Sequence, residues 1–470
     1  MDSMSRINEK CGVIALSSTK DMDVARYVYL GLWSVQHRGQ DSSGIASFDG
    51  FKLHEHKKSG LVSQVYDESS LAKLKGKVAI GHNRYSTTGG RDEALNQPYS
   101  YEKLGFAFAH NGNLPYIEKL MAYATQNHLT AAGLNDTGLM ALCLSNELSK
   151  TGSIIDSVRT CWPLFTGAFS CVGLYKNKVF AFRDEHGIRP LALGRTGNGF
   201  VVASETVALD IIGADYIREL RPGELIIIQD DQIESIQIID GHEKVDAFEF
   251  VYLARPDSNV SGQSVYHARY RAGQELAKVM PVKADVVLGV PDSGMSAATG
   301  FSHESGIGLE FGLLKNRYIG RTFIEPSKVR NSSIELKFNV IAKIVARKSI
   351  VLVDDSLVRG NTLKNVIRLL KEYGATSVHV RIASPPILYP DFYGIDTPDI
   401  NELIARRLKT DQIAELFDAE SLAYLPLHTF IKTTGLAKSR LCLSSFNGDY
   451  PIKVPYDDKV QIRENGFFTS

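Results

Sequence analysis

The chain has 470 residues, of which 53 are basic and 53 acidic, so its formal net charge is zero at pH 7. Hydrophobic residues make up 44% and charged residues 23%, a globular composition that is sufficient for two or three domains with cores of their own. This balance excludes a disordered chain and provides no overall attraction for nucleic acid or an anionic membrane, so neither is expected as a partner.

The five cysteines are odd in number and form no CxxC pair. This pattern argues against a disulfide framework and against a zinc knuckle. The first ten residues lack the apolar core of a signal peptide, and the longest charge-free apolar stretch, around 161–175, is interrupted by polar and turn residues. We therefore expect a cytoplasmic protein that does not span a membrane.

Short apolar runs bounded by turn residues dominate the first half of the chain and predict strands. Hairpin-like spacings favour antiparallel sheets, and three segments have the apolar spacing of helices. The predicted strands are 12–16, 43–48, 77–82, 106–114, 169–175, 178–182, 199–204 and 224–229, and the predicted helices are 24–36, 116–127 and 137–149. The first half is predicted to be an α+β domain.

After about residue 248 the pattern changes to strands that alternate with helices, which predicts an α/β domain with a parallel sheet. The predicted strands are 284–290, 309–314, 349–355 and 377–382, with helices at 264–280, after 294 and up to 373. We place the domain boundary in the polar stretch between 240 and 250.

Four polar groups in the first half lie at the ends of predicted strands, where a sheet presents functional groups from its rim. They are Cys11-Gly12, 37–40 (HRGQ), 81–87 (GHNRYST) and 110–114 (HNGNL). Each group by itself is compatible with an ordinary turn, and a lone cysteine is most often a buried small hydrophobe. Their combination points to a catalytic cysteine.

This constellation resembles the class II glutamine amidotransferases, whose glutaminase domain is an N-terminal-nucleophile hydrolase, over about 11–229. The resemblance implies that Cys11 becomes the first residue of the mature chain, because its α-amino group serves as the general base. An α-amine titrates near about 8 and can therefore transfer a proton at neutral pH. We expect residues 1–10 to be a propeptide that is removed.

The same resemblance implies a role for each matching residue. Asn111 and the amide of Gly112 would form the oxyanion hole, Arg84 would bind the glutamine carboxylate, and Asp136 would bind its ammonium group. Arg38 and Thr87 fall in matching motifs and would support glutamine binding. A cysteine–histidine dyad that uses His37, His82 or His110 remains the alternative.

Residues 349–362 (SIVLVDDSLVRGNT) combine a buried strand, two adjacent acids, a glycine loop and a helix start. This arrangement places Asp354 and Asp355 at the carboxyl edge of a parallel sheet, where ligands bind. The loop directs backbone amides toward one point, as in a phosphate site. The alternative is a pair of solvated acids followed by a simple turn.

The block closely resembles the phosphoribosyl pyrophosphate (PRPP) motif of type I phosphoribosyltransferases. That resemblance implies that the paired acids bind the ribose and that the loop holds the 5-phosphate. It also implies one Mg²⁺ per subunit at Ser293, Asp354 and Asp355. The PRPP-binding residues would be Asp354, Asp355, Ser356, Val358, Arg359, Gly360, Asn361 and Thr362, with Asp292 and Ser293 at the pyrophosphate and with Lys315, Arg317 and Arg321 on a loop that closes over the substrate.

Together the halves resemble the glutamine PRPP amidotransferases of purine synthesis. That family implies an αββα sandwich followed by a phosphoribosyltransferase domain, divided here as 1–10 (propeptide), 11–240 and 250–470. Ammonia released from glutamine would pass internally to C1 of PRPP and give 5-phosphoribosylamine, glutamate and diphosphate. The family also implies purine nucleotide inhibitors and a homotetramer or homodimer.

Some members of this family hold a [4Fe-4S] cluster on four cysteines, which correspond here to Asp246, Asp391, Ser439 and Cys442. One thiolate cannot hold such a cluster, so no iron-sulfur cluster is expected. Two other functions remain open. A sugar-isomerising or ATP-using amidotransferase would share the first half, and a PRPP-sensing regulator would need only the second.

Overall fold

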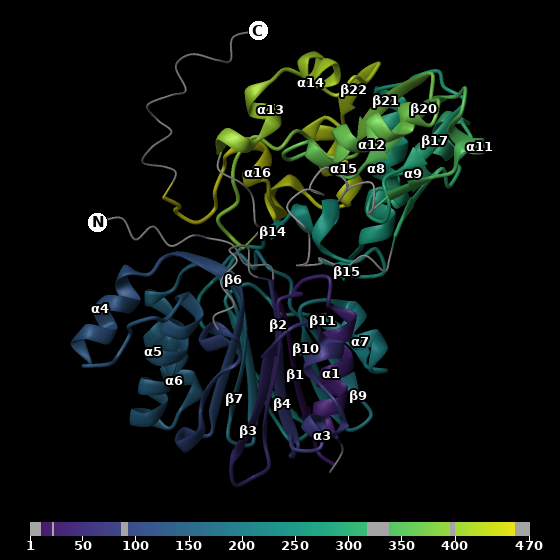
Figure 1. Cartoon of the computed structure of the whole chain (residues 1–470). Coiled ribbons are helices and arrows are strands. Elements are labelled where there is room, and N and C mark those ends of the chain that lie inside the picture. The colour runs from purple at the N-terminus through teal and green to yellow at the C-terminus, as the bar shows by residue number, and fades with distance from the viewer. Residues whose placement is uncertain (1–10, 21–22, 86–92, 317–337, 395–399, 456–470) are drawn as a thin grey trace.

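The computed structural model describes residues 11–20, 23–85, 93–316, 338–394 and 400–455. The chain folds into two units: an α+β unit at the N-terminus, purple to teal, and an α/β unit at the C-terminus, which runs from teal through green to yellow (Figure 1). Among the described helices, none combines the length and apolar character needed to cross a membrane.

The N-terminal unit contains two antiparallel sheets, called here sheet one and sheet two. Sheet one has the order β11-β9-β10-β1-β4-β2-β3, formed by β1 (Cys11–Ser18), β2 (Ser42–Phe48), β3 (Leu53–Ser59), β4 (Val78–Arg84), β9 (Ala192–Thr196), β10 (Gly199–Ala203) and β11 (Asp215–Glu219). Sheet two has the order β13-β12-β8-β7-β6-β5, formed by β5 (Tyr99–Tyr101), β6 (Phe106–Tyr116), β7 (Thr166–Tyr175), β8 (Lys178–Arg183), β12 (Glu224–Gln229) and β13 (Gln232–Gln237). All eight strands predicted in this half are present.

Helices cover the outer face of each sheet, which gives the predicted αββα sandwich. Along β1, Ile14 and Leu16 pack with α1 (Val24–Ser34) and α7 (Thr206–Ile211), whereas Val13 and Ala15 pack between the two sheets. This alternation follows from the period of two in a strand. The outer face of sheet two is covered by α4 (Glu118–Gln126), α5 (Asp136–Thr151) and α6 (Ile154–Cys161). The short helices α2 (Val62–Val65) and α3 (Glu68–Leu71) connect β3 to β4.

The C-terminal unit is built on a four-stranded parallel sheet in the order β17-β20-β21-β22, which confirms the predicted parallel sheet. Its strands are β17 (Val286–Gly289), β20 (Ser349–Asp354), β21 (Ser377–Ile382) and β22 (Ser421–Tyr424). Helices α8 (Val265–Val279) and α9 (Met295–Ser305) pack on one face, and α12 (Asn361–Glu372) and α14 (Thr410–Leu416) pack on the other.

One predicted strand, 309–314, does not join this sheet as a strand. Only Leu309 forms an isolated bridge to Val287, and β18 (Leu313–Lys315) pairs instead with β19 (Phe338–Val340). Phe311 is 60% exposed, so the apolar run has no continuous face to bury in the sheet. The apolar run predicted one strand, whereas the structure divides it between a single bridge at Leu309 and the start of β18, where Leu313 is buried in the core.

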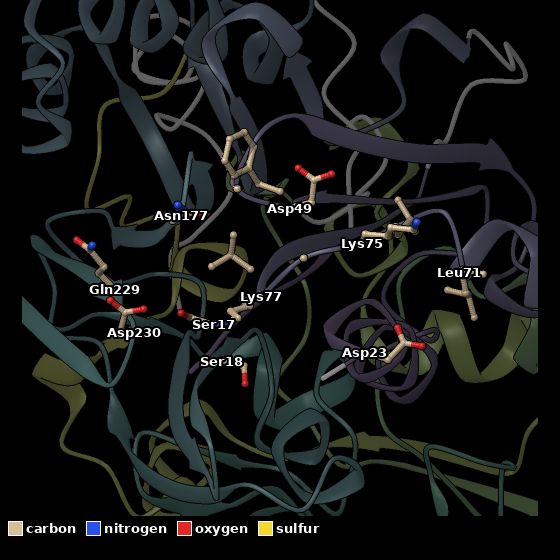
Figure 2. Close-up of a pocket in the computed structure, with 16 residues that line it drawn as sticks. Ser17, Ser18, Asp23, Asp49, Leu71, Lys75, Lys77, Asn177, Gln229 and Asp230 are labelled. Carbon is tan, nitrogen blue, oxygen red and sulfur yellow. The ribbon is translucent and has the colours of Figure 1, made fainter. Parts of the chain in front are cut away.

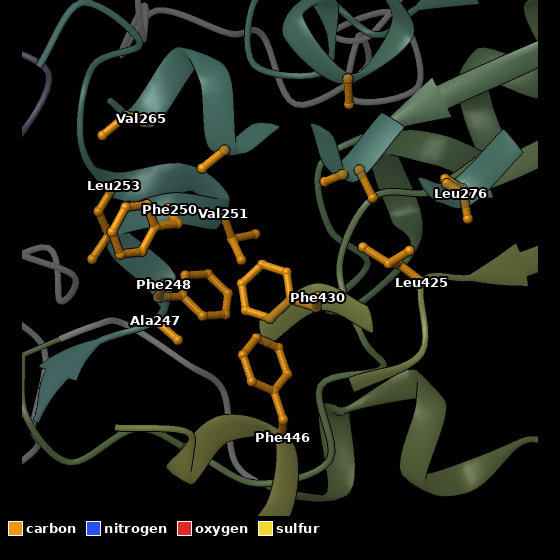
Figure 3. Packing of buried hydrophobic residues seen from close by; sticks show 14 of the residues in the cluster. Ala247, Phe248, Phe250, Val251, Leu253, Val265, Leu276, Leu425, Phe430 and Phe446 are labelled. Carbon is orange, nitrogen blue, oxygen red and sulfur yellow. The ribbon is translucent and has the colours of Figure 1, made fainter. Parts of the chain in front are cut away.

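The two units are joined by η4 (Glu249–Leu253), a single turn of π-helix. Its apolar side chains and Phe248 belong to the core of the C-terminal unit, with Phe430 of α15 (Leu427–Thr434) and Phe446 of α16 (Ser444–Asn447) (Figure 3). The ring centroids of Phe248 and Phe446 are 6.0 Å apart. This segment is therefore anchored in the C-terminal unit.

The stretch just before η4 contains the boundary predicted between 240 and 250. There β14 (Val245–Asp246) pairs in parallel with β23 (Leu441–Cys442) from near the other end of the chain. The division of the chain at this point stays a prediction. The remaining short elements of this unit are β15 (Asn259–Val260), β16 (Gln263–Ser264), α11 (Ala342–Val345) and α13 (Ile404–Arg407).

Candidate active sites

Cys11 is the first residue of β1, and it is 1% exposed. It shares the inter-sheet face with Val13, because alternate residues of a strand point the same way. Directly opposite it in the register is Arg84, the last residue of β4. The structure therefore brings two predicted glutamine-site residues together. Residues 1–10 and Thr87 lie outside the described residues.

Asn111 reaches the same end of the sandwich from sheet two. Two residues before it, Ala109 packs between the sheets, so Asn111 continues that face toward β1. Its Nδ2 lies 3.5 Å from Oγ of Ser204, and the same Oγ accepts a hydrogen bond of 2.9 Å from the amide of Val13. A single buried hydroxyl thus connects the predicted oxyanion donor with the strand that carries Cys11.

Gly112 and Asp136 complete this rim. Gly112 has φ +146°, and a Cβ there would lie 2.0 Å from the carbonyl oxygen of Ala168, so a side chain is excluded. Asp136 begins α5, and its Oδ2 accepts a hydrogen bond of 3.1 Å from the amide of Leu114 at the end of β6. The helix start therefore holds this carboxylate close to Leu114, two residues after Gly112.

The three histidines of the alternative dyad have other environments. His110 lies with Nδ1 3.2 Å from Oγ1 of Thr137 on α5, and burial lowers its pKa. His37 lies with Nε2 2.7 Å from Oε1 of Glu205. His82 faces Val13 in the register, but burial lowers its pKa to about 3. Such a histidine is a weak base at neutral pH. The choice between a dyad and the α-amine stays a prediction.

Arg38 is buried and bound to two carboxylates rather than exposed toward a ligand. Its guanidinium donates to Glu205 and to Glu249 of η4, on the C-terminal unit's side of the junction. Glu205 also accepts hydrogen bonds from the amide of Arg255 at 2.9 Å and from Oγ of Ser258 at 2.7 Å. A direct contact of Arg38 with glutamine stays a prediction, and the observed role is structural.

Ser204 and Glu205 do not stand out as functional residues in the sequence. The available signal was the one that identified the other groups, since this polar pair directly follows the strand residues 199–203. Its importance depends on contacts with residues about 50 to 190 positions away, which no local pattern reveals.

The second site lies at the carboxyl end of β20, as predicted. The amide of Asp355 donates to Oδ1 of Asp354 at 2.9 Å, and Oγ of Ser356 donates to Asp355 at 2.5 Å. Burial raises the pKa of both aspartates; the neighbouring Asp355 raises that of Asp354 further, while a hydrogen bond from Ser293 opposes the shift of Asp355. A bound cation would relieve this crowding of carboxylates.

The loop that carries Asp292 and Ser293 follows β17 and lies against β20. A Cβ on Gly294 would come within 2.7 Å of the carbonyl oxygen of Val353, so the approach requires glycine. Lys315 at the end of β18 reaches this loop, with Nζ 3.0 Å from Oδ2 of Asp292. Arg317 and Arg321 lie outside the described residues.

Asp354, Asp355 and Ser293 would hold a magnesium ion only if a bound substrate supplied further ligands. Among the described residues, no group of three or more His, Cys, Asp or Glu side chains could hold a metal ion. Mg²⁺ commonly keeps several waters and binds through one or two carboxylates plus substrate phosphates. Asp354, Asp355 and Ser293 supply this kind of incomplete oxygen set.

Within the predicted phosphate loop, 356–362, Gly360 has φ +85° and directly precedes α12. Gly360 gives α12 no side-chain cap, so the first amides of the helix are left for another acceptor. Asn361 and Thr362 are exposed there. The segment 402–404 holds this loop in place. The carbonyl of Val358 accepts a hydrogen bond of 3.0 Å from the amide of Ile404, and Arg359 donates to Glu402 at 2.6 Å.

The positions expected to replace cluster cysteines do not fit an iron-sulfur cluster. Asp246 and Cys442 are paired in β14 and β23, while Ser439 is exposed. Arg189 lies between the acids, with Nη1 2.9 Å from Oδ2 of Asp246 and Nη2 3.7 Å from Oδ1 of Asp391. An arginine–carboxylate network occupies this place.

A cavity of about 730 Å³ opens at the other end of β1 (Figure 2). Its lining includes Ser17, Ser18, Lys75, Lys77 and Asp230. Because Ser17 and Cys11 lie near opposite ends of the strand, this cavity belongs to neither predicted site.

Comparison with known proteins supports the family predicted for each half of the chain. Residues 82–210 match the glutamine amidotransferase domain family, and residues 263–384 match the phosphoribosyl transferase domain family. The chain is 44% identical over 455 residues to the amidophosphoribosyltransferase of Synechocystis, covering 95% of this chain and 92% of that one. It is 39% identical over 463 residues to the Bacillus subtilis amidophosphoribosyltransferase, covering 97% and 96%.

Two solved structures are also similar to this chain over nearly its whole length. The B. subtilis glutamine PRPP amidotransferase complexed with ADP and GMP has a TM-score of 0.87 and 38% identity, covering 95% of this chain and 98% of that one. A structure described as the allosteric regulatory enzyme of purine biosynthesis has a TM-score of 0.89 and 38% identity, covering 95% and 97%. With two matching domains, near-complete coverage and the paired acids at the end of β20, this chain belongs to the amidophosphoribosyltransferase family.

Proposed function

We propose that the chain hydrolyses glutamine at Cys11 and transfers the ammonia to C1 of PRPP, giving 5-phosphoribosylamine, glutamate and diphosphate. The observation that carries this proposal is the convergence of Cys11, Asn111 and Asp136 on one rim of the sandwich, in a chain whose second unit holds paired acids and an open helix start. The product would enter purine synthesis at its first committed step.

In the glutaminase site, Sγ of Cys11 attacks the carboxamide carbon of glutamine and the bond to nitrogen breaks, which releases ammonia and leaves a thioester. Water then cleaves the thioester to glutamate. The α-amine of Cys11 transfers the protons once residues 1–10 have been removed. Asn111 and the amide of Gly112 stabilise the developing oxyanion, while Arg84 and Asp136 bind the two charged groups of the substrate.

In the phosphoribosyl site, Asp354 and Asp355 orient the ribose and the loop 356–362 binds the 5-phosphate. Asp292, Ser293 and Lys315 would contact the diphosphate group as it leaves. Ser293, Asp354 and Asp355 would hold Mg²⁺, which would supply charge neutralisation for the diphosphate. By the family resemblance, Arg317 and Arg321 would also neutralise charge on the diphosphate.

The regulation and assembly of the protein are further parts of this proposal. The B. subtilis relative is described as complexed with ADP and GMP, and we extend purine nucleotide inhibition to this chain. A homotetramer or homodimer, a cytoplasmic location and the absence of an iron-sulfur cluster are proposed on the basis of the family resemblance and of the single thiol at the four cluster positions.

The deciding experiment is an assay for PRPP-dependent formation of glutamate and phosphoribosylamine, together with mass spectrometry of the purified chain. The expected result is activity in a chain that begins at Cys11. An active chain that begins at Met1 or Asp2 would contradict the N-terminal-nucleophile mechanism. Activity with other sugars or with ATP, and none with PRPP, would contradict the proposed reaction.

A further inference from the structure

Glu205 lies in the loop between β10 and α7 and is buried, with its side chain 0% exposed. One carboxylate oxygen, Oε1, accepts from Arg38 and His37, which follow α1 in the N-terminal unit. The other, Oε2, receives the amide of Arg255 and the hydroxyl of Ser258, which follow η4. The two oxygens of one carboxylate thus bind residues of different units.

The residue before it, Ser204, contacts the predicted catalytic groups. Its Oγ accepts from the amide of Val13, two residues after Cys11, and lies 3.5 Å from Nδ2 of Asn111. Because one hydrogen of Nδ2 is directed toward Ser204, the other hydrogen and the carboxamide plane have a defined orientation. Ser204 therefore contacts the predicted oxyanion donor, and the adjacent Glu205 contacts the C-terminal unit.

A second line of contacts leads from the same place to the PRPP site. Arg38 also binds Glu249 of η4, and Arg269 of α8 donates to the carbonyls of Phe250 and Ala254 at 2.8 Å each. Arg269 lines a small cavity together with Ser293 and Asp355. Buried hydrogen bonds thus run from the glutaminase rim to a residue that borders the paired acids.

We infer that Glu205 is a positioning residue for glutamine hydrolysis, which transmits the placement of the segment 255–258 to Arg38 and, through Ser204, to Asn111. This inference rests on the proposed function, because it assigns Asn111 as the oxyanion donor. An oxyanion donor acts mainly in the transition state, so a loss of its orientation lowers kcat more than it changes KM for glutamine.

The test uses the full-length processed protein with Ser258→Ala, Ser204→Ala and Glu205→Gln, assayed with glutamine and separately with ammonium as nitrogen donor. Energetic coupling through packed networks changes equilibria by amounts that correspond to about two- to thirtyfold. We expect each variant to lower the glutamine-dependent kcat by about five- to thirtyfold, with KM for glutamine and ammonia-dependent turnover within about twofold of the unsubstituted protein.

Matched controls are available in the helical layer of the same unit. Ser157 is a fully buried serine of α6, and Glu147 is a buried glutamate of α5 bound to Tyr123 and Lys150. Ser157→Ala and Glu147→Gln should leave the ratio of the two activities unchanged. Ser258→Ala removes only one hydroxyl, so it keeps the test open if Glu205→Gln does not fold.

The inference is overturned if Ser258→Ala and Ser204→Ala keep the unsubstituted ratio, if both activities fall together, or if only KM for glutamine changes. Failure of the proposed function would look different. The unsubstituted protein would then form no phosphoribosylamine from either nitrogen donor, and the inference would fall with it.

Discussion

The two units build their sites in different ways. The glutaminase rim gathers residues from β1, β4, β6, the start of α5 and the loop after β10, so its members span positions 11 to 205. The phosphoribosyl site takes most of its members from one block, 354–362, at the end of one central strand. A parallel strand followed by a loop and a helix concentrates ligand groups locally, whereas an antiparallel sandwich assembles them across its rim.

The helix starts at the two sites show the same contrast. Asn135 caps α5, since its Oδ1 accepts a hydrogen bond of 2.9 Å from the amide of Gly138, and this cap fixes Asp136. Helix α12 has glycine before it and no side-chain cap. One helix start is closed by a side-chain cap, and the other has no such cap, which is the arrangement that a phosphate site requires.

Cys11→Ala should separate the two units most clearly. Without the thiol, glutamine-dependent turnover is expected to fall by about 10⁴-fold or more, because the covalent step is lost. Ammonia-dependent product formation should persist, because the second site is intact. Cys143→Ala, a buried cysteine of α5, is the control. Loss of both activities in Cys11→Ala would contradict the independence of the two sites.

Asp355→Asn should affect both activities, because each depends on PRPP. With one of the two acids neutralised, metal and ribose binding weaken, and we expect a loss of about 10²- to 10³-fold with either nitrogen donor, comparable with the removal of a main electrostatic group. Steady-state kinetics against Mg²⁺ and PRPP measure this loss. A selective loss of only the glutamine-dependent activity would contradict the assignment.

His82→Leu tests how a buried histidine makes the stability of the sandwich depend on pH. Burial lowers the pKa of His82 from 6.5 to about 3, so the unfolded chain binds a proton that the folded chain excludes. The stability that follows from this difference is complete above pH 6.5 and is lost as pH falls toward 3, by about 1.4 kcal/mol per pH unit. Chemical denaturation at pH 7.5 and at pH 5 should show a smaller acid loss in the variant than in the unsubstituted protein. An unchanged acid loss would contradict the prediction.

Asn135→Ala should have the smallest effect. Loss of an N-cap costs about 1 kcal/mol of stability, and here it also loosens Asp136. We expect a modest rise of KM for glutamine with little change in the ammonia-dependent rate. Ser264→Ala removes the cap of α8 in the other unit and serves as the matched control, with a similar stability cost and no selective effect on glutamine. Equal effects of the two variants on KM for glutamine would contradict this distinction.

Most of the fold was predictable because strands and helices are local patterns of burial. The eight apolar runs of the first half became strands, and the alternation after residue 248 became a parallel sheet. The run 309–314 was the exception, because apolar composition cannot distinguish a core strand from a segment whose Phe311 is exposed.

The sequence by itself determined the two kinds of chemistry. An early cysteine with polar groups at strand ends and a compact acid–glycine block are both arrangements of neighbouring residues, and their meaning depends on local geometry. Only the tertiary structure decided how the two units are connected. The division of Glu205 between Arg38 and Ser258, and the bridge of Ser204 between Val13 and Asn111, join residues far apart in the chain. Buried polar groups need partners, and which partners they find depends on how the sheets and units pack.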